Sequence, residues 1–159
     1  MALAKGTNSY VDVAEADAYF ENRLDTAAWN LASAAQKAQA LVTGTQVLDT
    51  LSWVGVAVSD LQPLAFPRTG YYFDPRLGKT VTLTAAVPMR VVQANCEMAY
   101  HLLNNDGLLD NTGSVDSISL SGISLSNVKP PERVPPVVKR AIRPLLAAGA
   151  FNNTWWRAN

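Results

Sequence analysis

Residues 87–103 read VPMRVVQANCEMAYHLL, and this stretch predicts the central helix of the fold. Pro88 suits the first turn of a helix, because a proline has no N–H group that would be left unpaired there. Apolar side chains then recur at intervals of three and four residues and form one wide stripe. Its members are Met89, Val91, Val92, Cys96, Met98, Ala99, Leu102 and Leu103. A stripe this wide predicts a helix that other elements cover on more than one side.

Two further helices are predicted on the N-terminal side. Asp12 and Glu15 have the spacing of a capping box, in which each side chain pairs with the backbone N–H of the other residue. This box and the apolar stripe that follows it predict a helix over residues 13–24. Ser33 and Gln36 repeat the pattern and predict a longer, alanine-rich helix that ends near residue 51.

Gly44 lies within that alanine-rich helix, and Trp29 and Trp53 lie just outside its two ends. A glycine inside a helix costs roughly 1 kcal/mol relative to alanine, so we expect Gly44 to serve a close helix contact. We expect the two tryptophans to be buried anchors.

The helical period is lost between residues 54 and 87. This segment holds three prolines and three glycines, includes QPLAFPRTG at residues 62–70, and ends in the β-favouring KTVTLT. Such composition predicts a long loop. Within it, we expect Pro63 and Pro67 to hold a stiff strap, with Phe66 packed on the helices and Arg68 capping a helix or meeting an acidic neighbour.

The C-terminal third contains an arm, a helix and a tail. SISLSGISLS at residues 117–126 alternates apolar and small polar residues, which predicts two short strands joined at Ser121 and Gly122. A last helix is predicted from Val137 to about residue 148, shortened or kinked by Pro144. The tail ends in two tryptophans and an arginine.

These elements predict a mainly α fold. We expect a bundle of about four helices with a long central loop and a small β-hairpin or extended arm before the last helix. Residues 1–149 would form this domain, with the arm at about 114–128, and residues 150–159 would form a flexible C-terminal tail.

The sequence shows no pattern of a catalytic, cofactor or metal site. One cysteine and one histidine exclude an internal disulfide and a zinc site built from these residue types. Glu97 lies four residues before His101, which allows either a catalytic pair or a plain surface ion pair, and the ion pair is favoured. We predict that the protein is not an enzyme, and we expect synthesis in the cytoplasm because no signal peptide or membrane span is present.

Charge is distributed unevenly along a chain whose formal net charge is zero. Residues 1–60 carry seven acids and three bases, whereas residues 129–159 carry one acid and six bases. This asymmetry suits head-to-tail contact between copies or a basic segment that reaches an acidic partner. Solvated faces that merely differ in sign explain it equally well.

Several of these segments, taken in order, resemble a family of tailed-bacteriophage head-to-tail connector (adaptor) proteins. The most specific pieces are SYVDVAEADAYF near the N-terminus and the PLAFPRTG loop. Some members of that family are labelled as DnaT-like single-stranded-DNA-binding proteins. The resemblance implies a virion protein that forms a ring, of twelve copies, on the portal vertex. Such a ring extends the DNA channel and provides a platform for tail attachment.

The resemblance also implies partners and contact residues. The partners are the portal protein, a tail or neck component such as a stopper or terminator, and further copies of the chain; DNA would pass without sequence-specific binding, and no membrane is involved. The implied location is the virion neck, after assembly in the host cytoplasm. The expected portal-binding residues are Lys139, Arg140, Arg143, Phe151, Trp155, Trp156 and Arg157. The expected contacts between subunits are Phe66, Arg68, Ile118, Leu120, Ile123 and Leu125.

An alternative function is that of a single-stranded-DNA-binding accessory protein. The basic C-terminal third and its aromatic residues favour it, because cations hold phosphates and aromatic rings stack on bases. The neutral net charge of the chain favours the connector instead.

Overall fold

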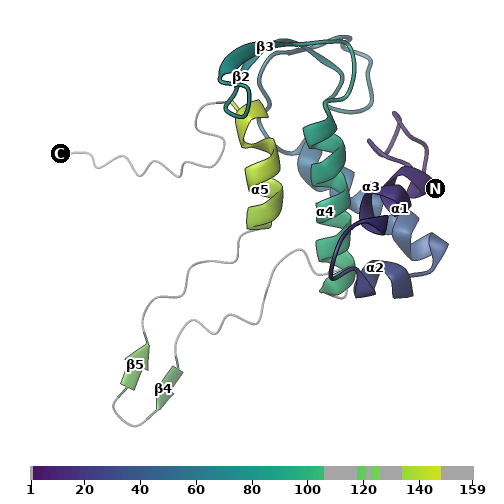
Figure 1. Cartoon of the computed structure of the whole chain (residues 1–159), viewed down its shortest axis with the longest axis vertical. Coiled ribbons are helices and arrows are strands. Elements are labelled where there is room, and N and C mark those ends of the chain that lie inside the picture. Colours follow the sequence, from purple (N-terminus) through teal and green to yellow (C-terminus); the bar gives the residue numbers. More distant parts are fainter. Residues whose placement is uncertain (1, 106–117, 121–122, 126–133, 148–159) are drawn as a thin grey trace.

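The computed structural model describes residues 2–105, 118–120, 123–125 and 134–147 (Figure 1). The helices are α1 (Val13–Glu21), α2 (Ala27–Leu31), α3 (Ala34–Asp49), α4 (Met89–Asn104), α5 (Pro136–Ile142) and the short 3-10 helix η1 (Arg143–Leu145). The strands are β1 (Val56–Ala57), β2 (Arg68–Asp74), β3 (Lys79–Leu83), β4 (Ile118–Leu120) and β5 (Ile123–Leu125).

The fold is mixed α/β, so the prediction of a mainly α bundle is wrong. The segment expected to be a long loop contains a three-stranded antiparallel sheet in the order β1-β2-β3. Its two longer strands read RTGYYFD and KTVTL, which are rich in the aromatic and β-branched residues that favour strands. A four-residue turn joins them, and Gly78 takes a positive φ of 64° there. Of the glycines and prolines that suggested a loop, Pro75 and Gly78 lie in the turn between β2 and β3, whereas Gly70 lies within β2.

Helix α4 lies at the centre of the helical part, as predicted. It packs against α3 and α5 and also contacts α1 and α2 (Figure 1). The buried side chains extend along its whole length, from Val91 to Leu102. A helix covered on several sides in this way explains why its apolar stripe is wide.

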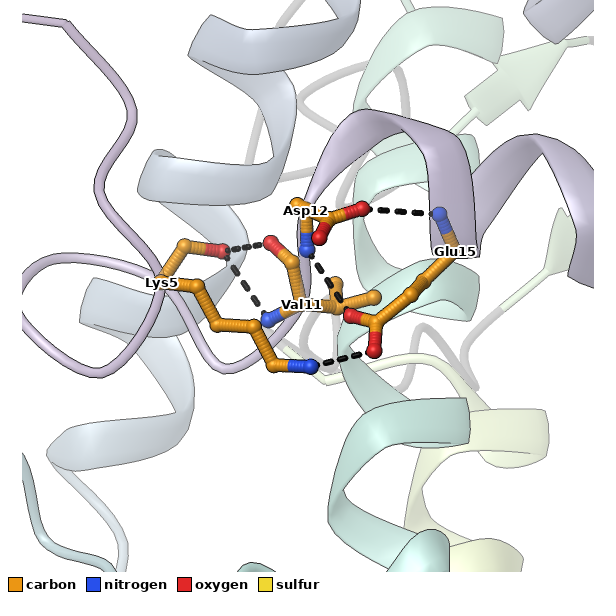
Figure 2. A network of polar contacts seen from close by, with 5 residues as sticks. Lys5, Val11, Asp12 and Glu15 are labelled. Atoms are coloured by element: carbon orange, nitrogen blue, oxygen red, sulfur yellow. Dashed lines mark hydrogen bonds and ion pairs between the residues drawn. The ribbon is translucent and has the colours of Figure 1, made fainter.

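Both predicted capping boxes are confirmed. The Asp12 carboxylate accepts a hydrogen bond from the Glu15 N–H at 2.8 Å, and the Glu15 carboxylate accepts one from the Asp12 N–H at 3.2 Å (Figure 2). The same glutamate forms an ion pair with Lys5, which fastens the N-terminal segment to α1 (Figure 2). Ser33 and Gln36 form the second box at the start of α3. The first helix ends at Glu21, earlier than predicted, and α2 follows as a separate short helix.

The strap in the central segment is packed as predicted. Phe66 is only 2% exposed, and its ring packs edge-on against the rings of Tyr10 and Trp53, with centroids 6.2 and 5.0 Å away. The peptide bond between Phe66 and Pro67 is cis. Trp29 is also buried, in a second apolar cluster with Phe20. Phe66 belongs to the first of these two clusters, and both clusters include residues of α3 and α4.

Gly44 lies at a close helix contact, as predicted. A Cβ atom at this position would lie 3.0 Å from the Asn95 side-chain oxygen and 3.4 Å from the Ala99 backbone nitrogen. Helices α3 and α4 approach one another there because Gly44 carries no side chain.

Of the C-terminal predictions, the paired strands are confirmed, and the last helix is present but ends before the predicted residue 148. Strands β4 and β5 pair antiparallel, with Ile118 opposite Leu125, as the repeat predicted. Helix α5 ends at Ile142, and η1, which contains Pro144, follows it. The turn at Ser121 and Gly122 and the tail at residues 150–159 lie outside the described residues. Among the helices of the described segments, none has the length and apolar character needed to cross a membrane.

Candidate nucleic-acid interface

Two aromatic side chains project from the outer face of β2. Side chains of a strand alternate between its two faces. Tyr72 packs against the core cluster and Asp74 is buried, so Tyr71 and Phe73 point outward. They are 70% and 58% exposed. Two large aromatic rings exposed together on a sheet mark a candidate contact site, because exposed apolar patches often bind a partner.

The neighbours of these rings leave their faces open. Across the hairpin, Tyr71 lies opposite Thr82 and Phe73 lies opposite Thr80, and both threonines are small and exposed. The two aromatic residues are two positions apart on one strand, which separates their Cα atoms by about 6.5–7 Å. The outer face of this hairpin therefore presents two accessible rings side by side on one strand.

Positive charge lies at the end of the same hairpin. Arg76 in the turn and Lys79 at the start of β3 are both exposed. No aspartate or glutamate points outward from β2 or β3, because the only acid in either strand, Asp74, faces inward. The outer face thus presents aromatic rings without carboxylates. The two cations lie at the end of the hairpin, where Lys79 is opposite the inward-facing Asp74.

Asp74 also fixes the hairpin to the helices. Its carboxylate accepts a hydrogen bond from the Arg76 N–H at 2.9 Å and forms an ion pair with Arg90 of α4 at 2.8 Å. Arg90 also donates to the carbonyl of Ala141 in α5, at 3.4 Å. Burial opposes the ionisation of Asp74, but the Arg76 N–H and the Arg90 guanidinium outweigh it and hold the pKa below its usual range. The ion pair between Asp74 and Arg90 therefore holds the hairpin against α4, and the hydrogen bond from Arg90 to Ala141 links α4 to α5.

Phe66 and Arg68, predicted to contact another subunit, make contacts within their own chain. Phe66 is buried in the core. Arg68 neither caps a helix nor meets an acid: its guanidinium donates to the carbonyls of Val54, Gly55 and Ala65, at 2.9, 2.6 and 3.3 Å. Arg68 therefore holds the segment at Val54 and Gly55 together with the strap that contains Ala65. Ile118, Leu120, Ile123 and Leu125 lie in β4 and β5, and their contact with another subunit stays a prediction.

The predicted basic residues of the last helix lie beside the sheet. Arg140 on α5 and Arg143 on η1 are exposed, whereas Lys139 is half-buried. Helix η1 packs against β2. The structure therefore brings a second group of cations to the neighbourhood of the hairpin. Four more predicted portal-binding residues lie outside the described residues, and they are Phe151, Trp155, Trp156 and Arg157.

The two interpretations of Glu97 and His101 both differ from what is observed. Glu97 is buried and accepts a hydrogen bond from the Tyr19 hydroxyl at 2.6 Å, and it forms an ion pair with Arg23. His101 contacts the side chain of Asn105 at 3.0 Å instead, and burial lowers its pKa. Glu97 is thus a structural link between α4 and the N-terminal helix.

Cys96 and the acidic residues of the described segments show no sign of a reactive or metal site. Burial, with the nearby acids, raises the pKa of the Cys96 thiol to about 12, which keeps it protonated at neutral pH. Across the described ranges, no group of three or more histidines, cysteines, aspartates or glutamates is placed to hold a metal ion.

A comparison with protein families matches residues 2–158 to the family described as "Putative DnaT-like ssDNA binding protein". The match spans nearly the whole chain, and the chain belongs to this family. No curated protein and no solved structure matches the chain. The family match supports the DnaT-like part of the resemblance noted above and gives no support to the connector part.

Four residues that define this site were not predicted from the sequence, and they are Tyr71, Phe73, Arg76 and Lys79. The signal was present, because the aromatic run YYF and the alternating TVTL flank a short segment that contains a proline and a glycine. The prediction of one long loop over residues 54–87 left this hairpin pattern unrecognised.

Proposed function

We propose that this protein binds single-stranded DNA through the outer face of the β2–β3 hairpin. The observation that carries the proposal is the pair of exposed rings, Tyr71 and Phe73, on a face without carboxylates, with two exposed cations at the end of the same hairpin. The family to which the chain belongs is described as binding single-stranded DNA, which supports the same function.

Stacking and charge would have separate roles at this face. Base-to-ring stacking contributes about 1–3 kcal/mol per base and tolerates any base. Arg76 and Lys79 would neutralise phosphates beside the stacked bases, and each phosphate neutralised on a single strand adds about −0.7 to the slope of log K against log salt. The hairpin would therefore bind without sequence preference and with a modest dependence on salt.

The test is fluorescence anisotropy with a labelled oligothymidylate at several salt concentrations. Tyr71→Ala and Phe73→Ala should each weaken binding by about 5- to 150-fold, the range that corresponds to one lost stacking contact. The salt slope should stay unchanged. The double variant Arg76→Ala with Lys79→Ala should instead reduce the slope by about 1.4.

Leu61→Ala is the matched control, because Leu61 is 93% exposed on the nearby loop and should leave affinity unchanged. Binding that survives both aromatic substitutions would refute the proposed site. Binding that disappears only in Arg140→Glu with Arg143→Glu would place the site on α5 and η1.

A ring-forming head-to-tail connector is a second proposal. The observation that favours it is the exposure of large apolar side chains on several separate elements, since such surface suits burial by other protein. These residues include Leu24, Leu31, Val56, Leu61 and Met89. In this role the partners would be the portal protein, a tail component and further copies of the chain, in the virion neck.

Copurification with a portal protein would test the connector proposal. Deleting residues 151–159 should remove portal binding, because the predicted contacts Trp155 and Trp156 lie there. Portal binding that is unchanged by this deletion would contradict the predicted contact, and the absence of any portal binding by the full chain would contradict the proposal.

A further inference from the structure

A groove between α1 and α2 lies over two buried aromatic rings and carries negative charge. It has a volume of about 530 Å³ and is lined by residues that include Asp17, Phe20, Glu21, Thr26, Trp29 and Asn30. Phe20 and Trp29 are both almost fully buried and form its apolar part, with ring centroids 4.7 Å apart. The groove is therefore an open site with an aromatic base.

The two carboxylates of the groove differ in what they already bind. Asp17 accepts a hydrogen bond from the Trp29 indole N–H at 2.8 Å and forms an ion pair with Lys37 at 2.7 Å. Glu21 is exposed, and in the part of the chain that the structure describes no cation pairs with it. Residues 12–31 carry five acids and one base in total. Glu21 thus offers a negative charge within a negative region.

Two exposed leucines are close in sequence to residues that line the groove. Leu24 precedes α2 and is 92% exposed, and Leu31 ends α2 and is 87% exposed. Nearly complete exposure of two leucines at the ends of one short helix is costly in water and favours a covering partner. The partner should therefore carry both apolar and cationic side chains.

The last helix of the same chain has this composition. Residues 136–145 contain three bases and no acid. Val137 is 37% exposed, and Arg140 lies three positions later, on the same side of α5. Arg143, also exposed, follows on η1. The two surfaces are complementary. Val137 matches the apolar leucines, and the two arginines match the negative charge of Glu21.

The helix cannot reach the groove of its own molecule. Helix α4 lies between them: α5 packs on α4, whereas α1 contacts α3 and α4 and α2 contacts α4 (Figure 1). The complementary surfaces thus lie on different sides of one chain. A contact between two different surfaces is heterologous, so it repeats from copy to copy and either closes into a ring or continues as a filament.

We propose that the groove between α1 and α2 receives the basic side of α5 and η1 from a second copy of this chain. The contact goes beyond DNA binding, and it needs no portal protein. The connector proposal requires a contact between copies, but this contact does not depend on the connector role.

A charge exchange tests the proposal by sedimentation velocity on the full-length protein over a range of concentrations. The wild type should self-associate, and association should weaken with added salt. Glu21→Lys and Arg140→Glu should each weaken self-association on the order of tenfold, because each replaces an attraction with a like-charge contact. An equimolar mixture of the two variants should associate again, because each mismatched surface then meets the opposite charge.

Two further variants separate charge from shape. Ala18→Trp, at an exposed position of the groove, should block association without a change in charge. Gln46→Lys adds the same positive charge on the exposed side of α3 and should have no effect.

A wild type that stays monomeric at every concentration would overturn the proposal. Variants that associate like the wild type, or a mixture that fails to associate, would also overturn it. The monomeric Glu21→Lys variant keeps Tyr71 and Phe73, so its binding to oligothymidylate tests the DNA function separately.

Discussion

Replacement of Phe66 by alanine should strongly destabilise the fold. The side chain is 2% exposed and packs edge-on against Tyr10 and Trp53, so its removal leaves a cavity at the junction of three segments. Truncation of a buried phenylalanine to alanine costs about 3–5 kcal/mol. For a chain of 159 residues, each kcal/mol lowers the melting temperature by about 2–4 °C, so the expected fall is about 6–20 °C.

Urea unfolding followed by far-ultraviolet circular dichroism measures this loss. The midpoint should fall while the m-value stays constant, because the same surface is exposed on unfolding. Leu61→Ala is the matched control, since Leu61 lies five residues earlier and is 93% exposed; its effect should be below about 0.5 kcal/mol. A loss of less than about 1 kcal/mol for Phe66→Ala would refute the assignment of this strap to the core.

Three further predictions concern the polar contacts that hold the elements in place. Arg68→Lys should cost about 1–3 kcal/mol, because a lysine cannot reach the three carbonyls that the guanidinium holds; an unchanged urea midpoint would contradict this. The folded-state pKa of Asp74 lies below the unfolded value of about 3.9, so its stabilising contribution is present above that pH and is lost as the pH falls through the folded-state pKa. Asp74→Asn should therefore be less stable than the wild type at neutral pH and should lose less stability on acidification, and parallel acid-unfolding curves for the two proteins would count against the ion pair with Arg90. Ser33→Ala removes the N-cap of α3 and should cost about 0.5–2 kcal/mol by urea unfolding, and a smaller effect would mean that water replaces the cap.

Local signals in the sequence predicted the helical part well. A capping box depends on residues three positions apart, so the starts of α1 and α3 could be placed from Asp12 and Ser33 alone. The central position of α4 followed from the width of its apolar stripe. Gly44 could be assigned to a close contact because a helix rarely tolerates glycine without such a reason.

Contacts between distant segments could not be predicted in this way. Glu97 meets Tyr19 and Arg23, which lie more than seventy residues earlier in the chain, and only the packing of α1 on α4 brings them together. For the same reason, the sequence could not show which aromatic side chains form the candidate DNA-binding site. Tyr71 and Tyr72 are identical in type, and only the inward position of Asp74, held by Arg90, shows which of the two rings faces solvent.

The two proposed surfaces are close enough to influence one another. Arg143 lies on η1, which packs against β2, the strand that carries Tyr71 and Phe73. A second copy that occupies α5 and η1 would place its acidic groove near the end of the DNA-binding face. That negative charge would repel phosphates, so self-association should weaken DNA binding, and bound DNA should weaken self-association by the same factor. Comparing oligothymidylate affinity at protein concentrations below and above assembly measures one side of this coupling. Sedimentation with and without the oligonucleotide measures the other, and unequal factors would show that the two sites do not act through a simple equilibrium.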